Sequence, residues 1–174
     1  MFMRAIAVAG GLAGAAGLSQ FPEFSQQYVQ RLSGAVDELS RFIAAFDADA
    51  AKFDLDREAA LADLEQGGRM AAARAESVRR TVTRHARLSE DLSVLRQAGP
   101  FTRAYEAGRL GDREIARATW EDFRQALPLT FEGGMFGGAG FLGGLLAIGG
   151  IGAVLRLFWG VLFGRKAARR GKKA

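Results

Sequence analysis

The chain has 174 residues, a formal net charge of +5 and no cysteine. This length suits one domain, or one small domain with membrane segments, and the lack of cysteine excludes disulfides, thiol nucleophiles and thiolate metal sites. All 19 acidic residues lie between Glu23 and Glu132, whereas eight of the 24 basic residues lie outside these limits. The net charge is therefore the sum of a mildly acidic middle and a strongly basic end.

The first apolar segment, residues 5–21, carries no charge over 17 residues and is rich in Gly and Ala. A membrane-spanning helix needs about 20 residues, so this segment is at the lower limit. We expect a retained transmembrane helix over residues 1–21. The alternative is a cleaved signal peptide, with Arg4 as its basic start and residues 13–15 as a small-x-small cleavage site.

Residues 22–130 predict a soluble, all-helical domain. Pro22 suits the first turn of a helix, and from Tyr28 onward apolar residues recur at steps of three and four, which is typical of a heptad seam. Residues 56–66 predict a short helix that the following Gly-Gly pair stops, and residues 69–98 predict a second seamed helix that ends before Pro100.

The two seamed helices are expected to pack against each other as an antiparallel, coiled-coil-like hairpin. A last helix is expected from Asp112, a natural N-cap, to Ala126. The seam residues are Tyr28, Leu32, Leu39, Phe42 and Phe46 in the first helix and Val78, His85, Leu88, Leu92 and Leu95 in the second.

The second apolar segment lies within residues 131–163. Residues 133–155 are 23 uncharged residues, ten of them Gly, which predicts a transmembrane helix. Arg156 follows, and its side chain can reach the membrane interface beside Trp159. The fold class expected is therefore all-α, with two transmembrane helices flanking the helical hairpin.

Orientation follows from the basic tail, residues 164–174, because Lys and Arg beside a span favour the cytoplasm. We expect a bacterial inner-membrane protein with both ends inside and the middle domain in the periplasm. The tail contacts anionic lipid in this hypothesis, and nucleic acid is not an expected partner because the tail follows a span and lacks interleaved aromatic residues. Its basic residues are Arg165, Lys166, Arg169, Arg170, Lys172 and Lys173.

Small residues recur at steps of three and four along one face of each span. Inside lipid, small side chains that let backbones approach are the main route to tight packing, so the spans are expected to pack on each other. A further set at Gly134, Gly138 and Phe141 favours self-association or another membrane protein, although a merely tolerant Gly-rich span would look the same. The predicted packing residues are Ala7, Gly10, Gly14 and Gly17 in the first span and Gly133, Gly137, Gly140 and Gly144 in the second.

Candidate chemistry is sparse. His85, the one histidine, occupies a seam position and is expected to be structural; with one His and no Cys, a zinc site of usual composition cannot form. A calcium loop starting at Asp54 would need Gly where Ala59 stands, and the stretch predicts a helix. We therefore expect no metal, no cofactor and no enzymatic activity.

Three stretches carry a resemblance to a known family: PEFSQQYVQRLSGAVDEL at Pro22–Leu39, GPF at Gly99–Phe101 and EIARATWEDFRQALPLT at Glu114–Thr130. With the Gly-rich last span, they resemble a family of proteobacterial membrane proteins, domain of unknown function 2937. The resemblance covers almost the full length and matches residues 48–75 least well. It implies a retained first span and an inner-membrane location, and it implies no activity.

Three functional hypotheses remain. The first is a non-enzymatic membrane scaffold or accessory subunit, which docks partners through its glycine faces and its coiled-coil surface. The second is a small oligomeric channel or transport component built from the Gly-rich second span. The third is a periplasmic protein that only its C-terminal span tethers, if the first segment is cleaved.

Overall fold

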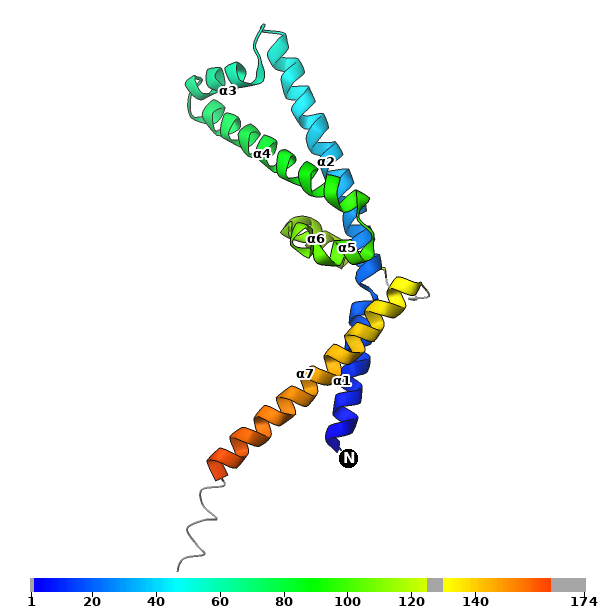
Figure 1. Ribbon diagram of the computed structural model, residues 1–174. Coiled ribbons are helices and arrows are strands. Elements are labelled where there is room, and N and C mark those ends of the chain that lie inside the picture. Colours follow the sequence, from blue (N-terminus) through cyan, green and yellow to red (C-terminus); the bar gives the residue numbers. More distant parts are fainter. Residues whose placement is uncertain (1, 125–129, 164–174) are drawn as a thin grey trace, which may run out of the picture. The chain divides into compact units, whose positions relative to one another are not determined.

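The computed structural model describes residues 2–124 and 130–163, and every regular element in these ranges is a helix (Figure 1). The chain divides into two compact units: the span unit, residues 1–23 with 125–174, and the middle unit, residues 24–124. The elements are α1 (Phe2–Ser19), α2 (Phe21–Ala51), α3 (Arg57–Gln66), α4 (Arg69–Gln97), α5 (Pro100–Tyr105), the 3-10 helix η1 (Ala107–Leu110), α6 (Arg113–Glu121) and α7 (Phe131–Phe163).

Two helical stretches of the described chain are long and apolar enough to cross a membrane. The first stretch, Met3–Ala51, runs through both α1 and α2, and its apolar part is near the N-terminus. The second stretch is Phe131–Phe158 in α7. Only Gln20 separates α1 from α2. Pro22 explains this break, because it has no N–H to donate to the carbonyl four residues earlier and its ring crowds that carbonyl.

In the middle unit, α2 and α4 run in opposite directions and share a core near the start of α2 (Figure 1). Apolar side chains from one face of each helix meet there, and Ile115 of α6 completes the cluster. The buried residues from the two long helices are Tyr28, Val29, Leu32, Val36, Leu88, Leu92 and Leu95. Burial of these side chains is the main force that holds α2 and α4 together.

Near the other end of α2, the packing differs from the expected two-helix coiled coil. Leu61 of α3 is 1% exposed and packs in a second cluster with Ala75 and Val78 of α4, against which Phe42 and Phe46 are partly buried. Helix α3 therefore lies between α2 and α4 at this end (Figure 1). The physical reason is that α3 has its own apolar face, which must be covered as well.

The segment after α4 is more helical than the sequence indicates. No helix is expected between Gly99 and Asp112, yet α5 and η1 fill this stretch. Pro100 takes the first position of α5, where its missing N–H costs nothing. Helix α6 begins after Asp112, as expected, but it ends at Glu121 rather than at residue 126.

Candidate functional site

The contact between α1 and α7 is made by backbone atoms. A Cβ atom added to Gly14 would lie closer than 3.0 Å to the carbonyl oxygen of Gly140, and one added to Gly140 would lie equally close to the carbonyl oxygen of Gly14. Gly144 meets the carbonyl oxygen of Gly10 in the same way. Real side chains do not approach so closely, so residues larger than Gly at these positions would force the helices apart.

The eight small residues predicted to pack are not all in this contact. The structure brings together Gly10, Gly14, Gly140 and Gly144, and it places Gly137 at ordinary contact distance, with its added Cβ 3.6 Å from Cβ of Ser19. Gly133 is buried and Ala7 is half-buried. Gly17 stands apart, because no described atom lies within 4 Å of its added Cβ.

Large side chains complete the contact, and the spacing of small residues did not reveal them. The ring of Phe141 lies over Gly11, with Cε2 2.8 Å from the added Cβ, and the side chain of Ile148 lies over Gly10. Its spacing grouped Phe141 with Gly134 and Gly138, the set predicted to face another partner, but Phe141 contacts α1. A large residue on one helix that faces a glycine on the other would have predicted these contacts. Such a pair can be recognised only when the register of the two helices is known.

Several glycines of α7 lie outside the contact with α1. Cβ atoms added to Gly134, Gly138, Gly143, Gly149 and Gly150 would meet nothing within 4 Å among the described residues. Gly134 and Gly138 are four residues apart and so lie on one face of the helix. A further helix could therefore approach the α7 backbone there without displacing α1.

The predicted seam residues of the middle unit lie toward its interior to different degrees. Leu92 is buried, and Leu39, Phe42 and Phe46 are partly buried. The predicted seam does not include Val29, Val36 and Ile43, which are buried beside it at seven-residue spacing. Fully buried seam residues are Tyr28, Leu32, Val78, Leu88 and Leu95.

His85 is half-buried and bridges the two long helices. Its Nε2 lies 2.7 Å from the hydroxyl oxygen of Ser40 on α2 and 3.3 Å from that of Ser89 on α4. A similar link joins the Arg96 guanidinium to the hydroxyl of Ser33 at 2.7 Å. These polar contacts join α4 to α2, and the structural role of His85 stays a prediction.

Asp112 is the centre of a buried polar network. Its carboxylate accepts a hydrogen bond from the N–H of Ile115 at the start of α6 and pairs with Arg84 at 3.2 Å and Arg87 at 2.7 Å. Burial raises the pKa of this carboxyl, but the hydrogen bond from Ile115 and the two arginines outweigh burial, so the pKa of Asp112 is lowered. The carboxylate therefore stays charged and ties α6 to α4.

Tyr28 completes this network from α2. Its hydroxyl accepts a hydrogen bond from the backbone N–H of Asp112, and burial raises the pKa of the Tyr28 hydroxyl. Arg103 of α5 is also buried and donates to the backbone carbonyl of Leu95 at 3.0 Å and to the Gln26 side chain at 2.7 Å. It thereby caps the last turn of α4 and joins it to α2.

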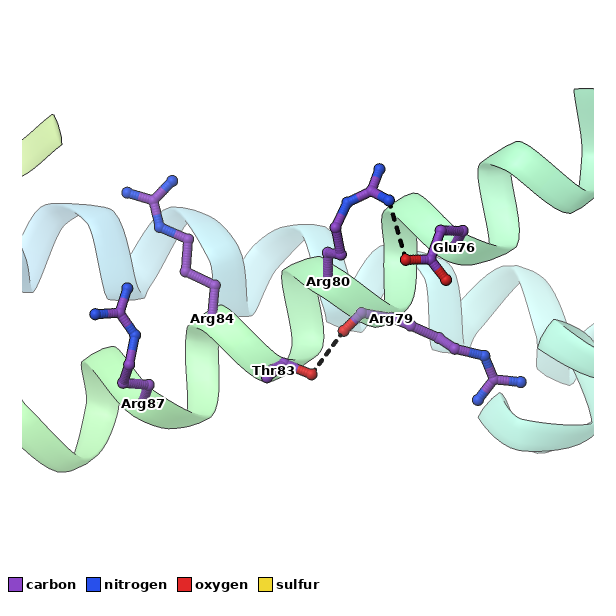
Figure 2. Close-up of a pocket in the computed structure, with 6 residues that line it drawn as sticks. All are labelled: Glu76, Arg79, Arg80, Thr83, Arg84 and Arg87. Atoms are coloured by element: carbon purple, nitrogen blue, oxygen red, sulfur yellow. Dashed lines mark hydrogen bonds and ion pairs between the residues drawn. The ribbon is translucent and has the colours of Figure 1, made fainter. Parts of the chain in front are cut away.

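An arginine-lined hollow of about 470 Å³ lies along α4 (Figure 2). Arg79 and Arg84 point to different sides of the helix in this view. The lining residues are Glu76, Arg79, Arg80, Thr83, Arg84 and Arg87.

Carboxylates pair with all four arginines of this hollow. Arg79 pairs with Glu58 and Glu65 of α3, Arg80 pairs with Glu76, Arg84 pairs with Asp112 and Glu114, and Arg87 pairs with Asp112. The hollow is therefore close to neutral, and its arginines hold α3 and α6 to α4 rather than offering a free site for an anion.

Two acidic residues near the turn from α2 to α3 have local structural roles. Asp56 accepts a hydrogen bond from the N–H of Ala59 and caps α3. The Asp47 carboxylate accepts a hydrogen bond from Nε of Arg57 at 2.7 Å. In the part of the chain that the structure describes, no group of three or more His, Cys, Asp or Glu residues could hold a metal ion. The basic tail, Arg165 to Lys173, lies outside the described residues.

One comparison identifies a family. A family model described as a protein of unknown function, DUF2937, matches residues 1–160. This match covers most of the chain, so the chain belongs to that family. No curated protein and no solved structure matches the chain.

Proposed function

We propose that this member of the DUF2937 family is a non-enzymatic scaffold or accessory subunit of the bacterial inner membrane. In this proposal α1 and α7 cross the bilayer with both chain ends in the cytoplasm, and the middle unit lies in the periplasm. The protein docks a further membrane helix, from another copy or another protein, on the open face of α7.

The two glycine faces of α7 support this function. One face contacts α1 backbone to backbone at Gly140 and Gly144, which makes the two spans a preformed pair. The other face, with Gly134 and Gly138, offers the same kind of close approach and is not occupied by any described residue. Lipid chains gain little from such a surface, whereas a helix gains packing contacts along it.

The chain connections of the middle unit support the membrane location. The backbone of Arg124 accepts a hydrogen bond from the Gln27 side chain at 3.1 Å, so the chain enters and leaves this unit at one end. Phe24 packs edge-on against Trp120 and Phe123 at the same end, and Trp120 is 72% exposed. An exposed tryptophan is typical of the interface between membrane and water.

Cysteine cross-linking in native membranes tests the docking face, because the chain has no cysteine of its own. A Leu142→Cys variant places a thiol on α7 at a residue that is 62% exposed. We expect cross-linked products that contain either two copies of this chain or one partner protein. Adding Gly138→Leu should reduce them strongly, because the new side chain fills the open face.

Gly143→Leu is the matched control, since Gly143 is equally open but lies about 140° farther around the helix at 100° per residue. This substitution should leave the products unchanged. If Gly138→Leu and Gly143→Leu had the same effect, the glycine face would have no docking role. Topology is tested separately: alkaline phosphatase fused after Gln66 should be active, and an active fusion after Ala174 would contradict the proposed orientation.

A further inference from the structure

A second hollow, of about 340 Å³, lies between α1 and α7 at the end of the span unit that holds Arg4 and Arg156. Both arginines line it, although they come from different helices. The remaining lining is apolar or glycine. The residues are Met3, Arg4, Ala7, Ile148, Gly149 and Arg156.

Among the described residues, no Asp or Glu side chain neutralises these two arginines. Asp and Glu do not occur before Glu23 or after Glu132, and among the described residues none forms an ion pair with Arg4 or Arg156. Glu132 lies in the first turn of α7, and Glu23 lies in the first turn of α2, just after the end of α1. Both are therefore far along the chain from Arg4 and Arg156. This hollow thus differs from the arginine-lined hollow on α4, where every guanidinium has an acidic partner.

The guanidinium of Arg156 is only partly satisfied by its own helix. Its Nε donates to the backbone carbonyl of Gly152 at 3.1 Å, which leaves the terminal nitrogens outside this bond. Those nitrogens carry further donors, and a guanidinium presents its donors in a fork that matches the oxygens of a phosphate group. Arginine at the edge of a hydrocarbon layer is stable when such an anion pairs with it.

The apolar lining limits which phosphate compound fits. Ala7 and Ile148 form a surface between the arginines and the helix contact, and Ile148 also covers Gly10. A small, fully hydrated anion would leave this surface in water. A phospholipid satisfies both parts, because its phosphate pairs with the arginines and the upper part of an acyl chain covers the apolar residues.

We infer that this hollow binds one anionic phospholipid of the cytoplasmic leaflet, with its phosphate held between Arg4 and Arg156. The inference rests on the proposed function in so far as α1 and α7 must cross the membrane. The inference goes beyond the proposed function, because it assigns a class of lipid and a binding site that bridges the two spans. The bound lipid fastens the N-terminal end of α1 to α7, beyond the glycine contact.

Native mass spectrometry of the full chain in detergent tests this assignment. The probes are phosphatidylglycerol and phosphatidylcholine with identical acyl chains, so only the head group differs. We expect the wild-type chain to retain one phosphatidylglycerol preferentially. The Arg4→Gln/Arg156→Gln variant should bind it more weakly, by about fivefold for each arginine lost.

Arg41→Gln/Lys52→Gln is the matched control, because it removes two positive charges as well, from side chains of the middle unit that are each 69% exposed and lie outside the hollow. It should bind phosphatidylglycerol like the wild-type chain. Arg156→Lys should bind with intermediate strength, since it keeps the charge but loses the forked donors. Equal losses in the control and in the arginine variant would overturn the site, because general charge attraction would then explain the binding.

Inorganic phosphate in excess distinguishes the two possible sources of the anion. We expect it to leave phosphatidylglycerol bound, and complete displacement would show that the hollow recognises a free phosphate rather than a lipid. The membrane assignment is checked independently by alkaline carbonate extraction of native membranes. If the chain resists extraction while the arginine variant binds lipid normally, the site alone is wrong; if the chain is extracted, the proposed function fails as well.

Discussion

The hydroxyl of Tyr28 accepts a hydrogen bond from the backbone N–H of Asp112 at 3.2 Å, and neither residue is more than 8% exposed. This single bond joins the first helix of the middle unit to the cap of its last helix. Because Asp112 also holds Arg84 and Arg87 of α4, three helices depend on the position of one residue.

Tyr28→Phe should lower the free energy of unfolding of the middle unit by about 1–3 kcal/mol, because it leaves the buried N–H of Asp112 without a partner. Urea unfolding of the full chain in detergent, followed by circular dichroism, measures the change. Tyr105→Phe is the control: Tyr105 is 88% exposed, so the change should stay within about 0.5 kcal/mol. Equal effects of the two substitutions would show that the bond to Asp112 contributes nothing.

The lowered pKa of Asp112 makes stability depend on pH. A carboxyl with a lowered folded pKa contributes stability that is complete above its ordinary pKa of 3.8 and is lost as pH falls through the folded value. Asp112→Asn should therefore destabilise the protein at neutral pH, and the difference from wild type should shrink below that ordinary pKa. Urea midpoints measured from neutral pH downward give this difference, and a constant difference would contradict the argument.

The contact between α1 and α7 predicts a specific disulfide. The Cβ of Ser19 lies 3.6 Å from a Cβ added to Gly137, which is within the range of about 3.5–4.5 Å found in disulfides. Ser19→Cys/Gly137→Cys should therefore oxidise readily within one chain, and a gel shift after partial proteolysis detects the bond.

The same disulfide reports on the glycine contact. Adding Gly140→Leu should slow its formation, because the new side chain meets the backbone of Gly14. Adding Gly143→Leu should not, since that position is open. Rapid oxidation in the Gly140→Leu background would mean that the helices do not meet at this residue.

Leu61→Ala should destabilise the middle unit by about 2–5 kcal/mol, because it leaves a cavity in the cluster that joins α3 to α4. Met70→Ala, at a residue that is 85% exposed, should change the stability little. Hydrogen exchange adds a spatial check: protection should fall first in α3. A uniform loss across all helices would argue against a separate second cluster.

The helix limits near glycine and proline could be predicted from the sequence. Helices are predicted at 56–66 and 69–98, and α3 and α4 occupy nearly these ranges. The prediction succeeds because Gly67, Gly68 and Pro100 act through backbone conformation alone. Gly68 has a backbone φ of +86°, a value that residues other than glycine rarely adopt. Such signals are local, so they do not depend on the tertiary structure.

The packing partners could not be predicted in this way. Heptad spacing identifies which face of α4 is buried, but it does not identify whether α2 or α3 covers Val78. Likewise, the spacing of small residues indicated Gly14 and Gly140, whereas the large residues over Gly10 and Gly11 depend on helix register. The arginine pair at residues 4 and 156 is equally hidden, because its members lie far apart in the sequence.

The position of α3 has a consequence for variation in length. Since Leu61 packs in one cluster with Val78, against which Phe46 is partly buried, we expect the ten residues of α3 to act as a spacer that holds the ends of α2 and α4 apart. Shortening the connection between Ala51 and Arg69 would bring the two long helices into direct contact and narrow this end of the domain. Insertions in this connection would move the two helix ends farther apart, whereas the core around Tyr28 would keep the other end of the domain packed.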